Sequence, residues 1–193
     1  MVCRVGAPLS PRGVSIIECS DTTDPGSEGR FMSHMLNLMR VPHEHVRVRT
    51  KQDLVHHLRT SPYAIIHIAT HGMFRRRRAA ADRFCGLWTR RGIMRRGDLQ
   101  SLEGQLRGRT VVCTACGAAH MAFRKPFVRI TGCKHYIAPK RRPTFCNAIL
   151  FAHVFYHKHL VLKRSVKSAF NEYKRGYKNP HRFVIESASS KSM

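Results

Sequence analysis

Two short, almost entirely apolar runs constrain the fold of this chain more than any other feature. The first spans 63–70 and is followed by His71, and the second spans 110–114 and is followed, after one alanine, by Cys116. Runs of this length that end in small or turn-forming residues are typical of strands buried inside a sheet. Because open α/β sheets build their sites at strand ends, the sequence makes His71 and Cys116 candidate functional residues.

The rest of the chain alternates between strand-like and helix-like patterns. Strands are predicted at 14–19, 45–48, 63–70, 110–114, 136–139 and 181–186. Helical spacing of apolar residues predicts helices between Ser27 and Pro42, and at 52–58, 98–106, 144–157 and 165–173. This order predicts an α/β fold, a three-layer sandwich in which a mostly parallel sheet of about six strands is flanked by helices.

Length and composition favour one domain. The 193 residues, of which 42% are hydrophobic, can bury one core, whereas a second full domain would be cramped. We assign this domain to 14–186, with an N-terminal extension at 1–13 and a disordered, serine-rich tail at 187–193. Two basic segments, 73–97 and 121–134, interrupt the pattern and are expected to be loops.

The cysteine content and the apolar pattern predict a cytoplasmic protein. Seven cysteines form an odd number and lack the dense spacing of a disulfide framework, so reduced thiols are expected. No apolar run is long enough for a membrane span. Residues 1–13 also lack the apolar stretch of a secretory signal.

Basic residues dominate the charge. Thirty-five Lys and Arg oppose eleven Asp and Glu, a formal net charge of +24, which attracts polyanions or acidic partners. The stretch from Arg75 to Arg96 contains nine arginines and a single acid, Asp82. A nucleic acid, an acidic protein, or solvent and salt could relieve the repulsion within it. The candidate polyanion-binding residues are Arg75, Arg76, Arg77, Arg78, Arg90, Arg91, Arg95 and Arg96.

Five motifs resemble, in order, those of the CHAT family of caspase-like cysteine peptidases. They are His-Ile-Ala-Thr-His-Gly at 67–72, Val-Val-Cys-Thr-Ala-Cys-Gly at 111–117, Tyr-Ile-Ala-Pro at 136–139, Phe-Tyr at 155–156 and Ser-Val-Lys-Ser-Ala-Phe at 165–170. The resemblance covers 14–186 and implies a caspase-like fold with His71 and Cys116 as catalytic residues. It also implies an oxyanion hole made by the backbone N–H groups of Gly72 and Cys116.

The residue types agree with what the resemblance implies. A thiol attacks a carbonyl carbon only as the thiolate, so Cys116 needs a base such as His71 within reach. Two N–H groups aimed at the developing oxyanion contribute on the order of 3 kcal/mol each. The expected reaction is hydrolysis of a peptide bond in a protein substrate through a thioester, without a cofactor. A backbone carbonyl, Glu18, Asp98 or Glu103 could orient His71.

The resemblance also bears on substrate and control. Caspase-like enzymes place a specificity residue just after the first strand, where this chain has Asp21 and Asp24. Either carboxylate could bind Arg or Lys at the P1 position of a substrate, or both could simply form a turn or a helix start. Family members are commonly controlled by helical-repeat or sensor modules, so a separate regulatory protein is an implied partner.

A zinc site is one alternative for the cysteines. Cys113-x-x-Cys116 with His120, and Cys133-x-His135, mimic zinc-ligand spacings. Strand alternation should, however, turn the sulfurs of Cys113 and Cys116 to opposite faces. Cys113 is therefore expected in the core, and no metal is assigned.

A binding module is the competing functional class. In this interpretation the scaffold is catalytically degenerate, and the basic surface binds nucleic acid or an acidic protein. The arginines would contact the polyanion, and Trp88 would offer a stacking surface.

Overall fold

The computed structural model of the protein describes residues 10–19, 28–77, 80–179 and 181–188. Its centre is a six-stranded sheet in the order β2-β1-β3-β7-β8-β9. The strands are β1 (Ser10–Glu18), β2 (His43–Arg47), β3 (Tyr63–Ala69), β7 (Thr110–Cys113), β8 (His135–Pro139) and β9 (Phe183–Ser187). β9 pairs antiparallel with β8, and the other strands pair in parallel. The predicted α/β fold with a mostly parallel sheet is confirmed.

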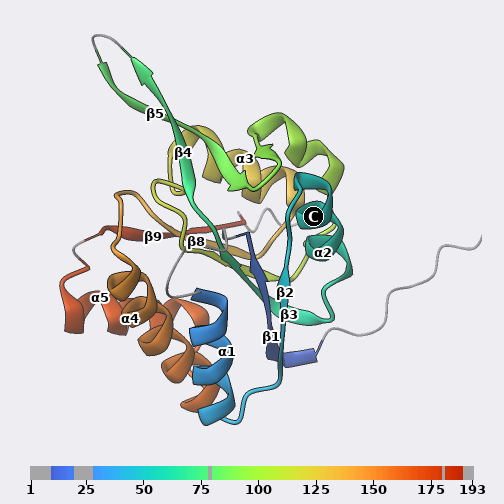
Figure 1. Ribbon diagram of the computed structural model, residues 1–193. Helices are drawn as coiled ribbons and strands as arrows, with labels where there is room; N and C mark the ends of the chain where they lie inside the picture. The colour runs from blue at the N-terminus through green and yellow to red at the C-terminus, as the bar shows by residue number, and fades with distance from the viewer. Residues whose placement is uncertain (1–9, 20–27, 78–79, 180, 189–193) are drawn as a thin grey trace, which may run out of the picture.

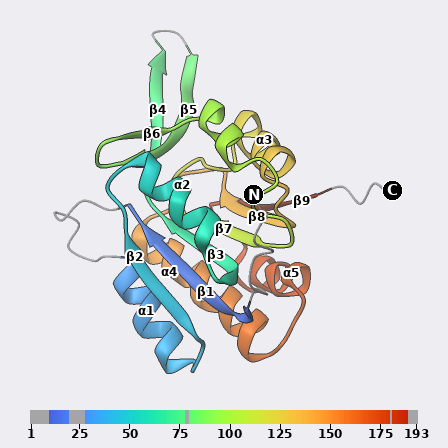
Figure 2. The same cartoon turned by 90° about the vertical axis from the view of Figure 1, so that its right-hand side faces the viewer.

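Helices cover both faces of this sheet, which makes the predicted three-layer sandwich (Figure 1, Figure 2). One face carries α2 (Lys51–Thr60) and α3 (Met121–Thr131). The other carries α1 (Glu28–Leu38), α4 (Phe145–Tyr156) and α5 (Val166–Tyr177), and α4 continues into the short π-helix η2 (His157–Val161). In β3, Ile66 and Ile68 pack in the α2–α3 layer and Ile65 in the opposite layer. The run is apolar because the sheet is buried on both faces.

Polar side chains mark where the helices begin. Thr50 and Asp53 form a capping box at α2: the Thr50 hydroxyl accepts from the Asp53 N–H at 3.0 Å, and the Asp53 carboxylate from the Thr50 N–H at 3.1 Å. Thr144 and Ser165 cap α4 and α5. α3 ends at Gly132, whose φ of 72° favours glycine. These local signals set the points at which the chain turns back over the sheet.

The segment 73–97, expected to be a loop, instead forms strands. They are β4 (Gly72–Arg77), β5 (Ala80–Thr89) and β6 (Gly92–Met94), which make a separate antiparallel sheet ahead of the 3-10 helix η1 (Arg96–Leu102). Phe74 lies opposite Phe84 in the register. Phe74, Phe84 and Leu87 pack against the core cluster that includes α3. Burial of these side chains stabilises strands that the many arginines conceal in the sequence.

The second basic segment, 121–134, is a helix over most of its length. Within α3, Phe123, Phe127 and Val128 follow helical spacing and are buried. Pro126 conceals this pattern because proline usually ends or kinks a helix. Here Pro126 lies inside α3 and is itself buried. The expectation of a loop was wrong for this reason.

The ends of the domain lie further out than predicted. β1 begins at Ser10, inside the expected extension 1–13, and β9 includes Ser187, the first residue of the expected tail. Residues 1–9 and 189–193 lie outside the described part of the chain. Among the helices that the structure describes, none combines the length and the apolar character needed to cross a membrane.

Candidate active site

His71 and Cys116 lie beyond the carboxyl ends of two neighbouring strands. β3 and β7 pair in parallel with Ile68 opposite Cys113, and the Thr114 N–H donates to the Ile68 carbonyl at 3.2 Å. His71 follows β3 on the way to β4, and Cys116 lies in the turn after β7. Because parallel strands bring their carboxyl ends to one edge of the sheet, the fold brings both residues to that edge.

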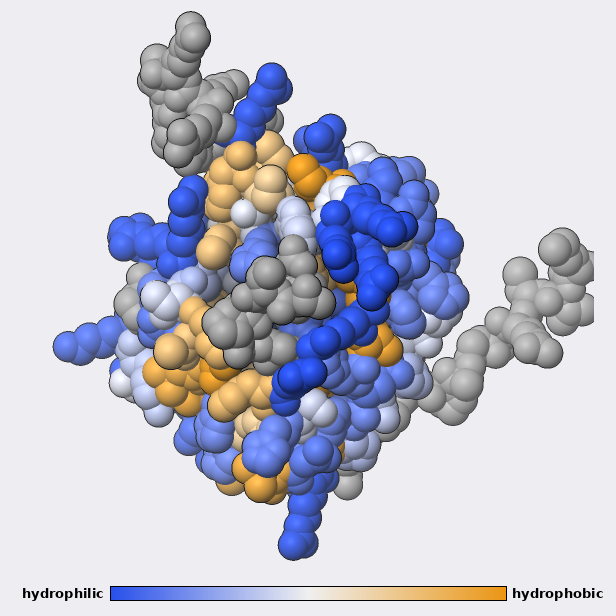
Figure 3. Space-filling view, in the orientation of Figure 1, coloured by the Kyte–Doolittle hydropathy of each residue, from blue (hydrophilic) through white to orange (hydrophobic). Residues whose placement is uncertain are grey.

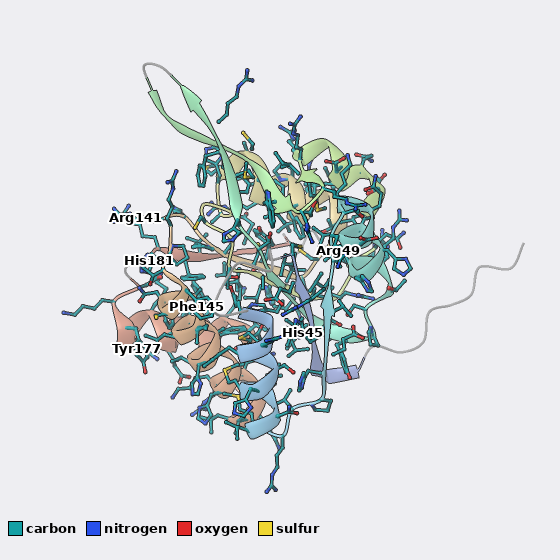
Figure 4. All side chains as sticks on the ribbon, in the orientation of Figure 1. His45, Arg49, Arg141, Phe145, Tyr177 and His181 are labelled. Carbon is teal, nitrogen blue, oxygen red and sulfur yellow. The ribbon has the colours of Figure 1, made fainter. Side chains whose placement is uncertain are left out.

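Both side chains line one small pocket of about 160 Å³. Cys116 is half-buried and His71 is exposed. Phe145, at the start of α4, forms part of the wall (Figure 4). The other lining residues are Glu18, Glu28, Ala69, Thr70, Thr114, Pro143, Thr144 and Ala148. A group bound in this pocket therefore lies against the thiol, the imidazole and two carboxylate-bearing residues.

Trp88 of β5 holds the segment that carries His71. The Trp88 N–H donates to the His71 carbonyl at 2.9 Å, and the Thr70 hydroxyl donates to the Trp88 carbonyl at 2.5 Å. The two rings pack edge to face with centroids 5.9 Å apart. Trp88 is half-buried, so it supports His71 in addition to any role on the surface.

The carboxylates considered for orienting His71 differ in position. Glu18 lines the same pocket as His71. Asp98 instead accepts from Lys51 Nζ at 2.7 Å, and Glu103 accepts from the Gln100 side chain at 2.7 Å. Of the three carboxylates, Glu18 is therefore the one that lines the same pocket as His71.

Gly72 allows β4 to approach the turn of Cys116. A Cβ atom at position 72 would overlap the backbone carbonyl oxygen of Cys116. Gly117 has a φ of 70°, and a Cβ there would press on the ring of Phe74. The backbone of Gly72, the residue expected in the oxyanion hole, thus lies directly against the residue expected to be the nucleophile.

Burial raises the pKa of the Cys116 thiol above its ordinary value, and the charge of Arg142 opposes this shift. The thiol is therefore protonated at neutral pH. A nucleophilic role requires a base to remove that proton as the reaction begins, and His71 lines the pocket with it.

Glu18 contributes a buried carboxylate to the pocket. It accepts hydrogen bonds from the Gly29 N–H at 2.9 Å, from His45 Nε2 at 3.0 Å and from Arg47 Nε at 3.1 Å. His45 belongs to β2, and its side chain extends toward Gly29 of α1 (Figure 4). These donors hold the side chain in one orientation at the end of β1.

Glu28 belongs to a polar network that the sequence analysis missed. Its Oε1 accepts from the Thr114 hydroxyl at 2.7 Å and from His67 Nε2 at 2.9 Å, and His67 Nδ1 lies 2.9 Å from the Tyr156 hydroxyl. Burial raises the pKa of Tyr156, so this hydroxyl keeps its proton and can donate it to Nδ1. The imidazole then accepts from Tyr156 at Nδ1 and donates to Glu28 from Nε2, so one tautomer satisfies both contacts. The sequence offered one signal for this network, His67 inside the apolar run 63–70, because a buried histidine needs hydrogen-bond partners.

Cys113 lies in the core, as predicted. It is completely buried on β7, and burial raises its pKa to about 12. The reason differs from strand alternation, because β7 ends at Cys113 and Cys116 lies in the following turn. Among the described residues, no group of three or more His, Cys, Asp or Glu is arranged to hold a metal ion.

The candidate specificity and polyanion-binding residues are only partly described. Asp21, Asp24 and Arg78 lie outside the described residues. Arg90 and Arg91 lie in the exposed turn between β5 and β6. Arg76 and Arg77 belong to the end of β4, whereas Arg75, Arg95 and Arg96 line a second hollow beside α3. Of the candidate arginines, Arg75, Arg95 and Arg96 are therefore the ones that share a described hollow.

The chain matches no protein-family model and no curated protein sequence. Inference about function therefore rests on the chemistry and geometry of the pocket.

Proposed function

We propose that the protein is a caspase-like cysteine peptidase that cleaves a protein substrate, with Cys116 as nucleophile and His71 as general base. The observation that carries this proposal is that both residues line one pocket at the carboxyl ends of the adjacent parallel strands β3 and β7. Five motifs in the order of the CHAT family support it. The reaction needs no cofactor.

The mechanism follows from these positions. His71 takes the proton from the Cys116 thiol as sulfur attacks the carbonyl carbon of the scissile bond. The N–H groups of Gly72 and Cys116 stabilise the oxyanion. Protonated His71 then gives its proton to the leaving amine, which leaves a thioester on Cys116. Water, deprotonated by His71, hydrolyses the thioester and restores the thiol.

The proposed substrate has Arg or Lys at P1. Glu18 and Glu28 both line the pocket, and no described lining residue carries a permanent positive charge. The Glu18 carboxylate is fully buried and pairs with Arg47. A guanidinium or ammonium group there would therefore meet the Glu28 carboxylate, which is held by Thr114 and His67. Asp21 and Asp24 remain candidates, and Glu28, which lines the same pocket as Cys116, is added to them.

A thiol-directed peptide probe with arginine at P1 tests the catalytic proposal. It should label Cys116, and the substitutions Cys116→Ala and His71→Ala should each abolish labelling and cleavage of a matching fluorogenic peptide. Cys146→Ala, which removes an exposed cysteine of α4, is the matched control and should label normally. Labelling that persists in both Cys116→Ala and His71→Ala would remove the assignment.

A second candidate function is a basic binding module that has lost catalysis. The raised pKa of Cys116 and the exposed arginines favour it. Binding to nucleic acid predicts an affinity for a single-stranded oligonucleotide that falls steeply with salt on logarithmic axes. A flat dependence would exclude a nucleic-acid partner.

We place the protein in the cytoplasm, where it would meet its substrate and a regulatory protein. The cysteines that the structure describes are free thiols, which suits a reducing compartment.

A further inference from the structure

A hollow larger than the pocket at Cys116 lies between the β4–β5–β6 sheet, η1 and the start of α3. Its volume is about 1090 Å³, against about 160 Å³ for the pocket at Cys116. Figure 3 shows pale-orange apolar surface near the base of the β4–β5 hairpin, with deep-blue side chains around it. Arg75, Arg95 and Arg96 line this hollow, which we call the arginine groove.

The floor of the arginine groove is apolar. Phe74, Phe84, Ile93 and Phe123 line it from four different elements, β4, β5, β6 and α3. The rings of Phe74 and Phe84 pack with centroids 5.8 Å apart, and those of Phe84 and Phe123 with centroids 5.3 Å apart. These rings support the half-buried side chains of Met73 and Ile93, which also line the groove and give it an apolar surface onto which aliphatic or aromatic side chains can pack.

The rings of the floor are poorly placed for stacking with nucleic-acid bases. Arg142 already covers Phe74, with its guanidinium carbon 4.5 Å from the ring centroid. Phe84 and Phe123 are only 6% and 3% exposed. Because base stacking needs an open ring face, the floor favours protein side chains over bases.

The rim of the groove is positively charged. Arg75, Arg95 and Arg96 are all exposed, and none of the described residues that line the groove is acidic. Charge complementarity therefore selects an acidic occupant. An apolar floor below a basic rim matches an extended segment in which acidic and apolar side chains alternate, because alternate residues of such a segment point to opposite sides.

We propose that the arginine groove binds an acidic, apolar-alternating segment of a partner protein. The floor takes the apolar side chains, and the three rim arginines pair with the carboxylates. This binding is separate from catalysis, so it can be measured on a protein whose candidate nucleophile has been removed. Loss of the proposed peptidase function would leave it intact.

Fluorescence anisotropy on the Cys116→Ala protein tests this proposal. The probe is a labelled peptide in which glutamate alternates with leucine and phenylalanine. Replacing its glutamates by glutamine, or its apolar residues by serine, should each weaken binding by about tenfold or more, because both kinds of contact contribute. A single-stranded oligonucleotide is the competing probe. The proposal would be overturned if the peptide with serine in place of its apolar residues bound as tightly as the original peptide. It would also be overturned if the oligonucleotide bound this groove more tightly than the original peptide.

Charge reversal locates the binding surface. Arg95→Glu with Arg96→Glu should weaken peptide binding by about tenfold, whereas Arg90→Glu with Arg91→Glu makes the same charge change outside the groove and should alter it by less than about threefold. Equal losses in the two double variants would show attraction by net charge alone and would refute the groove. Circular dichroism checks that both variants fold.

Cross-linking gives a second readout that needs no charge variant. Cys85 lines the groove, whereas Cys146 is exposed on α4. The same peptide carrying a chloroacetyl group should react with Cys85 in the Cys116→Ala protein, and Cys85→Ser should abolish that adduct. An adduct that forms mainly on Cys146, or none at all, would contradict binding in the groove.

Discussion

The pocket at Cys116 and the arginine groove adjoin one strand but have opposite chemistry. Gly72, the first residue of β4, lies against the Cys116 carbonyl, and Phe74, two residues later, lines the groove. The pocket is small and contains Glu18 and Glu28, whereas the groove is large and bordered by arginines. One strand thus lies between a pocket lined by two glutamates and a groove lined by three arginines.

The two regions also differ in how their charges are held. Glu28 accepts hydrogen bonds from Thr114 and His67, so its carboxylate is fixed before a ligand arrives. The arginines of the groove are exposed, and an exposed ion pair contributes only about 0–1 kcal/mol. The pocket can therefore select a single side chain, whereas the groove needs several contacts and an apolar floor to bind one segment.

Gly72→Ala should have the largest effect, and mainly on the pocket. The new Cβ would displace the turn of Cys116 and the proposed oxyanion donors, so kcat/KM for a fluorogenic peptide should fall by about 100-fold. It would also meet the ring of Phe84 in the floor of the groove, but less closely than the Cys116 carbonyl, so binding of the alternating peptide should fall by a smaller factor than kcat/KM. Gly176→Ala, where a Cβ meets no atom within 4 Å, is the control and should keep full activity. Equal activity of both variants would show that the close approach at Gly72 is dispensable.

Glu28→Gln should have the next largest effect by removing negative charge while keeping a hydrogen-bond acceptor. For substrates with Arg or Lys at P1, kcat/KM should fall by about 10-fold or more because a charge-assisted contact is lost. Substrates with a neutral P1 residue should be cleaved at an unchanged rate. Glu44→Gln, on β2, is the matched control. A similar loss for every P1 residue would assign Glu28 to the support of the Cys116 turn and not to specificity.

The elements of the central sheet could be predicted because their signals are local. The runs at 63–70 and 110–114 are apolar throughout, since the sheet is buried on both faces, and each ends in a turn. The prediction that His71 and Cys116 share one edge needed only parallel pairing of β3 and β7. Each of these inferences uses residues that are close in sequence or a general rule of sheet topology.

The Glu28 network and the small sheet could not be predicted in the same way. His67 meets Glu28 across 39 positions and Tyr156 across 89, so no local pattern joins them. In β4 and β5, arginines stand between the apolar residues that anchor the strands, and in α3 Pro126 interrupts a helical pattern. In both segments, tertiary burial outweighs the local propensity.

Arg142→Gln should have the smallest effect and tests whether the two regions communicate. Arg142 lies over Phe74 in the floor of the groove, and its charge lowers the pKa of Cys116 against the larger, raising effect of burial. Without that charge the pKa should rise further, which moves the pH profile of Cys116 alkylation by iodoacetamide to higher pH. At neutral pH less thiolate is present, so the alkylation rate should fall by about threefold. Arg141 is the neighbouring residue and is also exposed (Figure 4), so Arg141→Gln is the control and should leave the pH profile unchanged. Identical pH profiles for the two variants would mean that the charge of Arg142 does not affect the pKa of Cys116.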